Sequence, residues 1–351
     1  HALDIAEQEH EAYAVFGQID YNLTDNLVFT GGLRWTKEDK DMTNDFSEVN
    51  PGLGFAFFPP LAPRENVDEN IDDDQVTGTA KLSWFANEDI MFYASYGTGY
   101  KAGGINTDRI DTALDVNFDA EESEAYELGM KADFPDQALR VNVALHKTDT
   151  DDLQTISFQS VGFALQNAGT AETWGGELDV FWQPLNNTTM TLAYAYNDAE
   201  YEDFEQGSCW VGTPFHTQQP DPTSNGDGSC DRSGGQLSGN PENVVVTSLR
   251  QDFQLGGNIT AFLYGEYIWF DERMTDVNQD PLKLADDYNL INLRAGLVFE
   301  NWDAEIVAWG RNVGDEDYTN TIADGVVQDG RMIAYYNEPS TWGVTLRKNF
   351  N

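Results

Sequence analysis

The clearest pattern in this chain is the alternation of apolar and polar residues. Between positions 13 and 23, most apolar side chains occupy odd positions and the polar ones occupy even positions. The same two-residue period recurs at 27–36, 76–84, 139–146, 174–182 and 291–300. A β-strand sorts alternate residues onto two faces, whereas a helix would scatter them around its circumference. The pattern therefore predicts an all-β chain of antiparallel strands.

The lengths of the strands and of their connections narrow the fold further. Many runs extend for about ten residues, and a tilted strand needs roughly nine to eleven to cross a bilayer. The connections are alternately short and long, and the long loops, which we expect to be extracellular, lie at about 40–74, 101–120, 203–240 and 315–338. Short turns at one end and long loops at the other are typical of membrane barrels. We expect an antiparallel up-and-down transmembrane β-barrel, with roughly thirteen strands in a single domain over 1–351.

Composition agrees with a membrane barrel once the alternation is known. The mean hydropathy of -0.50 would normally indicate a soluble protein, but only every second residue of a barrel strand faces lipid. Aromatic residues make up 13% of the chain, which suits girdles at the two membrane interfaces. The net charge of -42 argues against a nucleic-acid partner, because little is present to neutralise phosphates. Acidic residues cluster in the long loops, so we expect much of this charge to form a coat on one rim.

The only two cysteines, Cys209 and Cys230, lie in one polar, glycine-containing segment. A local pair of this kind predicts a disulfide in an oxidising compartment, and two unrelated free thiols are the alternative. Closing such a loop would contribute roughly 3 kcal/mol in the chain-entropy model.

Motifs of enzymes are missing from the sequence. It holds no HExxH, GxSxG, P-loop or CxxC motif, so we expect no catalytic residues, no cofactor and no resident metal. The acidic loops do not match an EF-hand. Their carboxylates could bind Ca²⁺ specifically, bridge to lipopolysaccharide through divalent ions, or simply be solvated.

Two C-terminal segments resemble a known family. AWGRNVGDEDY at 308–318 is similar to the penultimate-strand signature of TonB-dependent outer-membrane receptors, and PSTWGVTLRKNF at 339–350 is similar to their closing strand. Segments 92–106 and 167–178 also resemble the family. The resemblance implies a Gram-negative outer membrane, a barrel of about 22 strands, and a plug and early strands that lie outside this chain. It also implies that Phe350 is the signal read by the barrel-assembly machinery.

The function that the resemblance implies is TonB-dependent import of a scarce nutrient. A small-molecule ligand would bind at the loops, and TonB would act through the plug. Ferric siderophores or other iron complexes are the first expectation, with oligosaccharide or cobalamin as alternatives. Two further classes stay open at this point: a passive porin or fatty-acid channel, and a soluble β-rich adhesion or binding protein.

Two groups of side chains are candidate site residues. The first group lies on the face opposite the apolar one and is expected to face the lumen: Arg34, Lys81, Glu127, Lys131, Arg140, Glu177, Asp179, Glu266, Arg294 and Arg347. The alternative for these is a hydrated wall whose charges pair across strands. The second group, expected to bind ligand at the mouth, is Tyr100, Lys101, Trp210 and Phe215. Their alternative is a role in the interface girdle or in loop packing.

Overall fold

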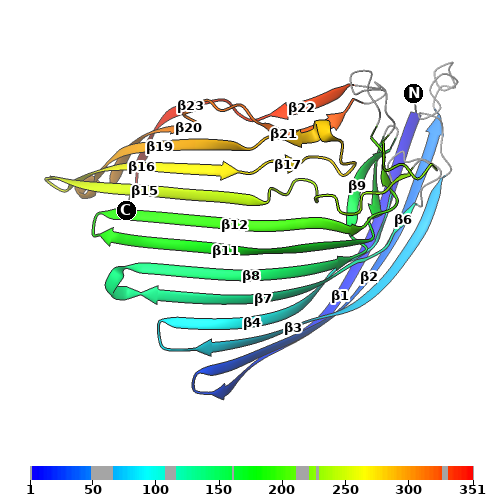
Figure 1. Ribbon diagram of the computed structural model, residues 1–351, viewed down its shortest axis with the longest axis horizontal. Helices are drawn as coiled ribbons and strands as arrows, with labels where there is room; N and C mark the ends of the chain where they lie inside the picture. The colour runs from blue at the N-terminus through cyan, green and yellow to red at the C-terminus, as the bar shows by residue number, and fades with distance from the viewer. Residues whose placement is uncertain are drawn as a thin grey trace.

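The computed structural model describes residues 2–48, 66–106, 116–159, 162–210, 221–226, 229–325 and 331–350. Its main feature is one antiparallel sheet of 13 strands, in which consecutive long strands are neighbours (Figure 1). Across the sheet these are β1 (Ala2–Thr24), β2 (Leu27–Glu48), β3 (Val67–Phe85), β4 (Ile90–Lys101), β7 (Glu121–Phe134), β8 (Leu139–Asp151), β11 (Thr170–Leu185), β12 (Thr188–Asp203), β15 (Asn243–Gly256), β16 (Ile259–Phe270), β19 (Tyr288–Phe299), β20 (Ala304–Arg311) and β23 (Thr341–Lys348). The predicted all-β, up-and-down meander is confirmed. No helix in the described ranges is long and apolar enough to span a membrane.

The two ends of the strands differ, as the connection lengths predict. Tight turns join the strands at one end, and the long loops gather at the other (Figure 1). The turn between β15 and β16 shows how the short links are made, because Gly257 (φ 62°) and Asn258 (φ 63°) both adopt left-handed conformations. Such residues give a hairpin the twist of its flanking strands. Short 3₁₀ turns complete two other links, at Pro135–Gln137 and Glu300–Trp302.

The long loops carry small sheets of their own. These two-stranded pairs are β5 (Gly104–Ile105) with β6 (Asn117–Phe118), β9 (Gln154–Gln159) with β10 (Gly162–Asn167), β13 (Gly207–Ser208) with β14 (Ser229–Cys230), β17 (Arg273–Met274) with β18 (Leu284–Ala285), and β21 (Thr319–Asp324) with β22 (Met332–Tyr336). A further 3₁₀ turn spans Pro281–Lys283. The loop end is therefore folded rather than irregular throughout.

The expected loop at 40–74 is too long. Strand β2 continues to Glu48, β3 starts at Val67, and the two strands pair as far as Asn44 and Val67. Polar cross-strand contacts hold this extension together: Asn70 donates to Asp39 at 3.2 Å and to Asp41 at 2.8 Å. Polar residues predominate on both faces here, so the alternation that marks the membrane segment is lost although the ladder continues.

Among the described residues, no second sheet is packed against the long sheet, and its apolar side chains are correspondingly exposed. Tyr13 is 62% exposed, Val15 69% and Leu33 68%. The described hydrophobic core lies instead at the loop end, where Tyr201 and Phe204 are buried together. Apolar side chains arrayed along one sheet face in this way are expected to contact lipid rather than water. This disfavours the soluble adhesion alternative.

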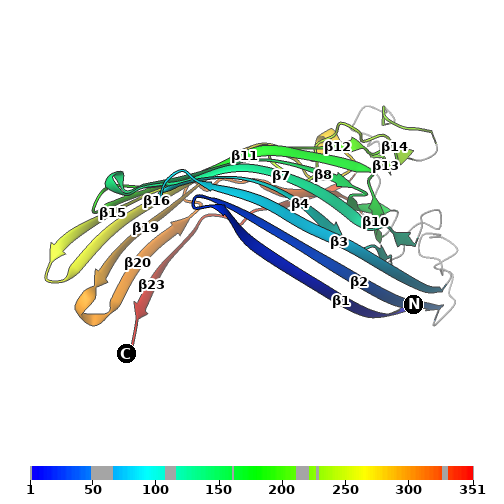
Figure 2. The ribbon, with the colours of Figure 1, turned by 90° about the horizontal axis from the view of Figure 1, so that it is seen from below.

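The sheet is curved, and β1 and β23 form its two margins (Figure 2). Within the described residues, each of these strands has a neighbour on one side only. An open edge in hydrocarbon leaves backbone N–H and C=O groups unpaired, at a cost of several kcal/mol per group. The sheet is therefore complete in a membrane only when further strands pair with both margins.

Produced alone, residues 1–351 should not form a closed barrel. We expect a single, heat-insensitive band when the segment is refolded in detergent and run on a gel with and without boiling. The product of the complete gene serves as the control and should shift on boiling. A monomeric, heat-modifiable band from the segment alone would contradict the open-edge argument.

Candidate functional site

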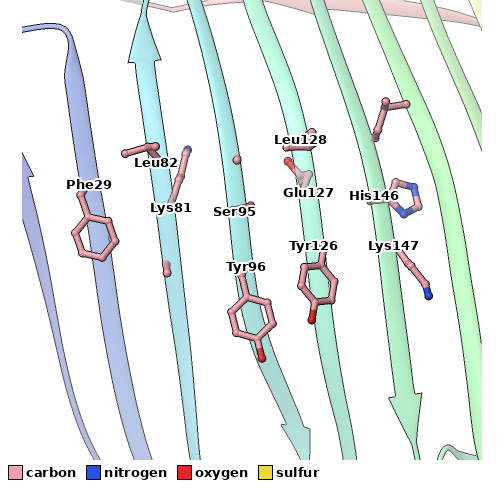
Figure 3. Close-up of a pocket in the computed structure, with 13 residues that line it drawn as sticks. Phe29, Lys81, Leu82, Ser95, Tyr96, Tyr126, Glu127, Leu128, His146 and Lys147 are labelled. Atoms are coloured by element: carbon pink, nitrogen blue, oxygen red, sulfur yellow. The ribbon is translucent and has the colours of Figure 1, made fainter.

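The polar face of the sheet collects the residues expected to line a lumen. The strand register places all ten on one face, since Lys81, Ser95, Glu127 and His146 are partners in sequence across β3, β4, β7 and β8. Figure 3 shows Lys81, Ser95, Glu127 and His146 on four successive strands. The pairings of the other strands place the remaining residues of the group on the same face of the sheet. These are Arg34, Lys131, Arg140, Glu177, Asp179, Glu266, Arg294 and Arg347.

The charges on this face contact one another and nearby rings. The Tyr93 ring lies 4.7 Å from the Lys81 ammonium and 6.0 Å from that of Lys131, and its hydroxyl donates to Glu127. Gly129 makes this possible, because a β-carbon there would collide with the Tyr93 ring. These contacts fit the cross-strand pairing alternative for this cluster. A direct role of the ten residues in a transport path stays a prediction.

Other members of the group also have partners. Arg140 pairs with Asp133 at 2.6 Å, and Arg347 pairs with Glu305. Arg294 lies 5.1 Å from the Tyr264 ring. Mixed charges held in this way keep the face hydrated without a strong field of one sign.

The opposite face holds a shallow apolar depression of about 590 Å³ across β2 to β8. Leu82 and Leu128 contribute to it, and the rings of Tyr96 and Tyr126 lie side by side with centroids 5.0 Å apart (Figure 3). Because this is the face of the exposed apolar residues, we assign the depression to the lipid-facing wall rather than to a ligand site.

The two cysteines form the predicted disulfide, which spans 21 residues of the loop between β12 and β15. Beside it, Asp221 and Arg232 form an ion pair that is almost fully buried, and Arg232 also donates to the Ser208 carbonyl at 2.7 Å. The guanidinium lies 5.2 Å from the Trp210 ring. Trp210 is thus part of the packing of this loop, which favours the packing alternative over ligand binding.

The environment of Asp221 changes its acidity. Burial acts to raise its pKa, but hydrogen bonds from Arg232, from Thr223 and from the Trp210 N–H outweigh burial and hold the pKa below its ordinary value of 3.8. The ligand atoms of Cys209, Asp221 and Cys230 lie within 4.8 Å of one another. They do not make a metal site, because both sulfurs are in the disulfide and the carboxylate is paired with Arg232.

The residues expected to bind ligand are not brought together. Tyr100 and Lys101 end β4, where the Lys101 ammonium lies 3.9 Å from Glu121. Trp210 belongs to the disulfide loop, and Phe215 lies outside the described residues. Ligand binding by this set stays a prediction.

Sequence reasoning missed a pocket of about 380 Å³ at the loop end. It lies between β9, the loop before β15, the loop before β19 and the β21–β22 pair. Its lining is Ile156, Ser238, Thr275, Asp276, Val277, Thr321, Ile322, Ala323, Asp324, Ile333 and Tyr335. The only available signal was the run of apolar residues at 332–336 within an otherwise polar loop.

A buried lysine joins two walls of this pocket. The Lys283 side chain is 0% exposed, and its ammonium donates to Asp276 and to Asp324 at 2.6 Å each. Asp276 is on the same loop as Lys283, whereas Asp324 comes from β21. The lysine therefore fixes the β16–β19 loop against the β20–β23 loop.

The motif at 308–318 forms the corner that leaves β20. Asn312 is buried with φ 47°; its side-chain amide donates to the Glu316 carbonyl at 2.8 Å and its side-chain oxygen accepts the Glu316 N–H at 2.9 Å. Tyr318 then stacks on Tyr288 with ring centroids 3.7 Å apart. The motif residues thus direct the chain from the strand into the pocket-forming loop.

Comparison with known proteins places this geometry in a family. A family described as "TonB dependent receptor-like, beta-barrel" matches residues 3–313. The pesticin receptor of Yersinia enterocolitica is 31% identical over 175 residues, which are 49% of this chain and 24% of that protein. The solved structure of the ferric yersiniabactin uptake receptor FyuA from Yersinia pestis has a TM-score of 0.77 at 18% identity, covering 100% of this chain and 47% of that one. The siderophore receptor PiuA from Acinetobacter baumannii gives 0.69 at 18%, covering 97% and 43%.

The extent of these matches limits what each one shows. The matched part of this chain covers about a quarter of the length of the pesticin receptor, and the whole chain covers about half of FyuA. At 18% identity, the likeness to the solved structures shows the fold alone. Membership of the family is shown by the match of the β-barrel family to residues 3–313.

Acid should loosen the disulfide loop. The pKa of Asp221 is lower in the folded protein than the value near 3.8 that it has in the unfolded chain. The ion pair therefore contributes its full stability above pH 3.8 and loses it as the pH falls through the pKa of the folded state. Hydrogen exchange at 229–233, corrected for intrinsic rate, should stay slow at neutral and mildly acidic pH and accelerate below 3.8.

Substitutions distinguish the contribution of the Asp221–Arg232 ion pair from the effects of acid on other groups of the loop. Arg232→Met leaves a buried carboxylate unpaired and should cost the loop about 3–5 kcal/mol at neutral pH. The double variant Arg232→Met/Asp221→Asn should recover part of that loss and no longer respond to acid. Acid-dependent exchange that persists unchanged in the double variant would assign the effect to other groups.

Proposed function

This chain belongs to the TonB-dependent receptor family, as part of its β-barrel, and we propose that the protein imports an iron complex across the outer membrane. Members of the family are transport receptors of the Gram-negative outer membrane. The observation that carries the proposal is the match of the barrel family to residues 3–313, together with a sheet whose faces and ends suit a transmembrane wall.

The choice of iron complexes rests on the relatives. FyuA is a ferric yersiniabactin uptake receptor, and PiuA is a siderophore receptor. A probable siderophore receptor is also 26% identical to this chain over 195 residues. A ferric siderophore is therefore the first cargo to test, ahead of oligosaccharide and cobalamin.

In this proposal the two ends of the sheet have different tasks. The long loops face the exterior and bind the iron complex, and the polar face borders the hydrated path. Energy reaches that path from TonB through a plug contributed by sequence outside this chain. Phe350 is 89% exposed just beyond β23, where it is available to the barrel-assembly machinery.

Uptake of radioactive iron tests the function directly. A strain lacking the complete gene should lose uptake of at least one ferric complex and grow poorly under iron limitation, and the restored gene should recover both. Uptake should stop when tonB is deleted or a protonophore is added. Uptake that survives both treatments would support a passive channel instead.

A further inference from the structure

We propose that the loop pocket between β9, β21 and β22 is a cargo subsite selective for a cationic iron chelate, one that carries an ammonium group beside an apolar surface. The inference rests on the proposed function and specifies the class of iron complex. It is carried by the pocket's shape, its exposed apolar side chains and the charges that line it.

The size and setting of the pocket suit part of a small molecule. Its volume of about 380 Å³ lies within the range of small-molecule clefts. The walls come from four separate parts of the loop end, and they are held in place by hydrogen bonds. Arg273 donates to the Thr319 and Asn320 carbonyls at 3.2 Å each, and Gln279 donates to the Gln236 carbonyl at 2.8 Å. A subsite built in this way is largely formed before the ligand arrives.

The apolar part of the lining is exposed among the described residues of the loop end. Ile156 is 57% exposed, Ile333 44% and Tyr335 58%, although all three belong to loop strands beyond the ends of the long strands. Apolar side chains gathered around a cleft at an aqueous end indicate a partner with apolar surface.

The charged part of the lining is negative overall. Asp276 and Asp324 share the single ammonium of Lys283, which leaves one net negative charge at the pocket wall. Lys283 is fully buried beneath them, whereas the carboxylates keep 23% and 26% of their side chains exposed. A ligand in the pocket therefore meets the carboxylates and not the ammonium.

The charged residues around the pocket add to its negative charge. The loop at 271–287 carries six acidic residues and two basic ones, Arg273 and Lys283. Both bases are buried, and Arg273 is directed at backbone carbonyls and the Tyr288 ring. The next loop adds Asp315, Glu316 and Asp317 close to β20. Such a field attracts a cation and repels a polyanionic chelate.

Three probes that differ in charge test the proposal on the complete, detergent-purified receptor. They are a ferric trihydroxamate with a pendant ammonium, the same chelate with that amine acetylated, and a trianionic ferric tricatecholate. Quenching of tryptophan fluorescence reports the Kd of each. The cationic probe should bind roughly tenfold tighter than its acetylated twin, and the difference should shrink at high salt. The tricatecholate should bind weakest.

Variants of Lys283, Asp276 and Asp324 are expected to change the preference for the cationic probe in opposite directions. Lys283→Met leaves both carboxylates uncompensated and should widen the preference for the cationic probe. The triple variant Lys283→Met/Asp276→Asn/Asp324→Asn removes the charges together, a change that buried ion pairs often tolerate, and should abolish the preference. The control Asp286→Asn/Asp317→Asn neutralises exposed acids of the same two loops outside the pocket lining and should reduce the preference far less than the triple variant, because these charges act at longer range and are screened by salt. A heat-modifiable band confirms that each variant is folded.

Several results would overturn the proposal. These are tightest binding of the tricatecholate, equal binding of the two trihydroxamates, or a preference that survives in the folded triple variant. Energised uptake of the tricatecholate would overturn the charge selectivity while leaving iron import in place. Failure to take up any iron complex would instead count against the proposed function.

Discussion

The structure depends on one constraint: in hydrocarbon, every backbone N–H and C=O must find a partner within the protein. The chain meets it with one continuous antiparallel ladder of 13 strands, in which every strand between the margins β1 and β23 pairs with a strand on each side. The same constraint explains why the margins at β1 and β23 require further strands. It also explains why the connections lie at the two ends of the strands, since the chain can leave the ladder only where water is available to its backbone.

The ladder determines what each face can do. One face presents apolar side chains to lipid, and the other carries charges that contact partners on adjacent strands, as Arg140 contacts Asp133. Specific recognition is therefore left to the loop end. There the chain builds compact structure from a disulfide, small strand pairs and buried ion pairs such as Asp221–Arg232 and Lys283–Asp324.

Much of the fold could be predicted because its signal is local. The two-residue period requires only neighbouring positions, so the strands, their count and the sorting of residues such as Lys81 and Glu127 onto one face followed from the sequence. The Cys209–Cys230 pairing was predictable because only two cysteines exist. The extension of β2 and β3 was missed because polar residues predominate on both of its faces, so its apolar positions are too few to show a two-residue period.

The sequence by itself thus determined an all-β membrane sheet, the alternation of its short and long connections, and its family resemblance. Only the tertiary structure decided which residues come together to form a pocket at the loop end. Ile156, Asp276 and Ile333 are far apart in the chain and meet because strand register and loop hydrogen bonds bring four segments together. The burial of Lys283 beneath two carboxylates is likewise a non-local outcome, since nothing in its own segment distinguishes it from a solvated loop lysine. The two-residue period of a strand depends on residues that are adjacent in the sequence. A pocket depends on distant segments that the fold brings into contact.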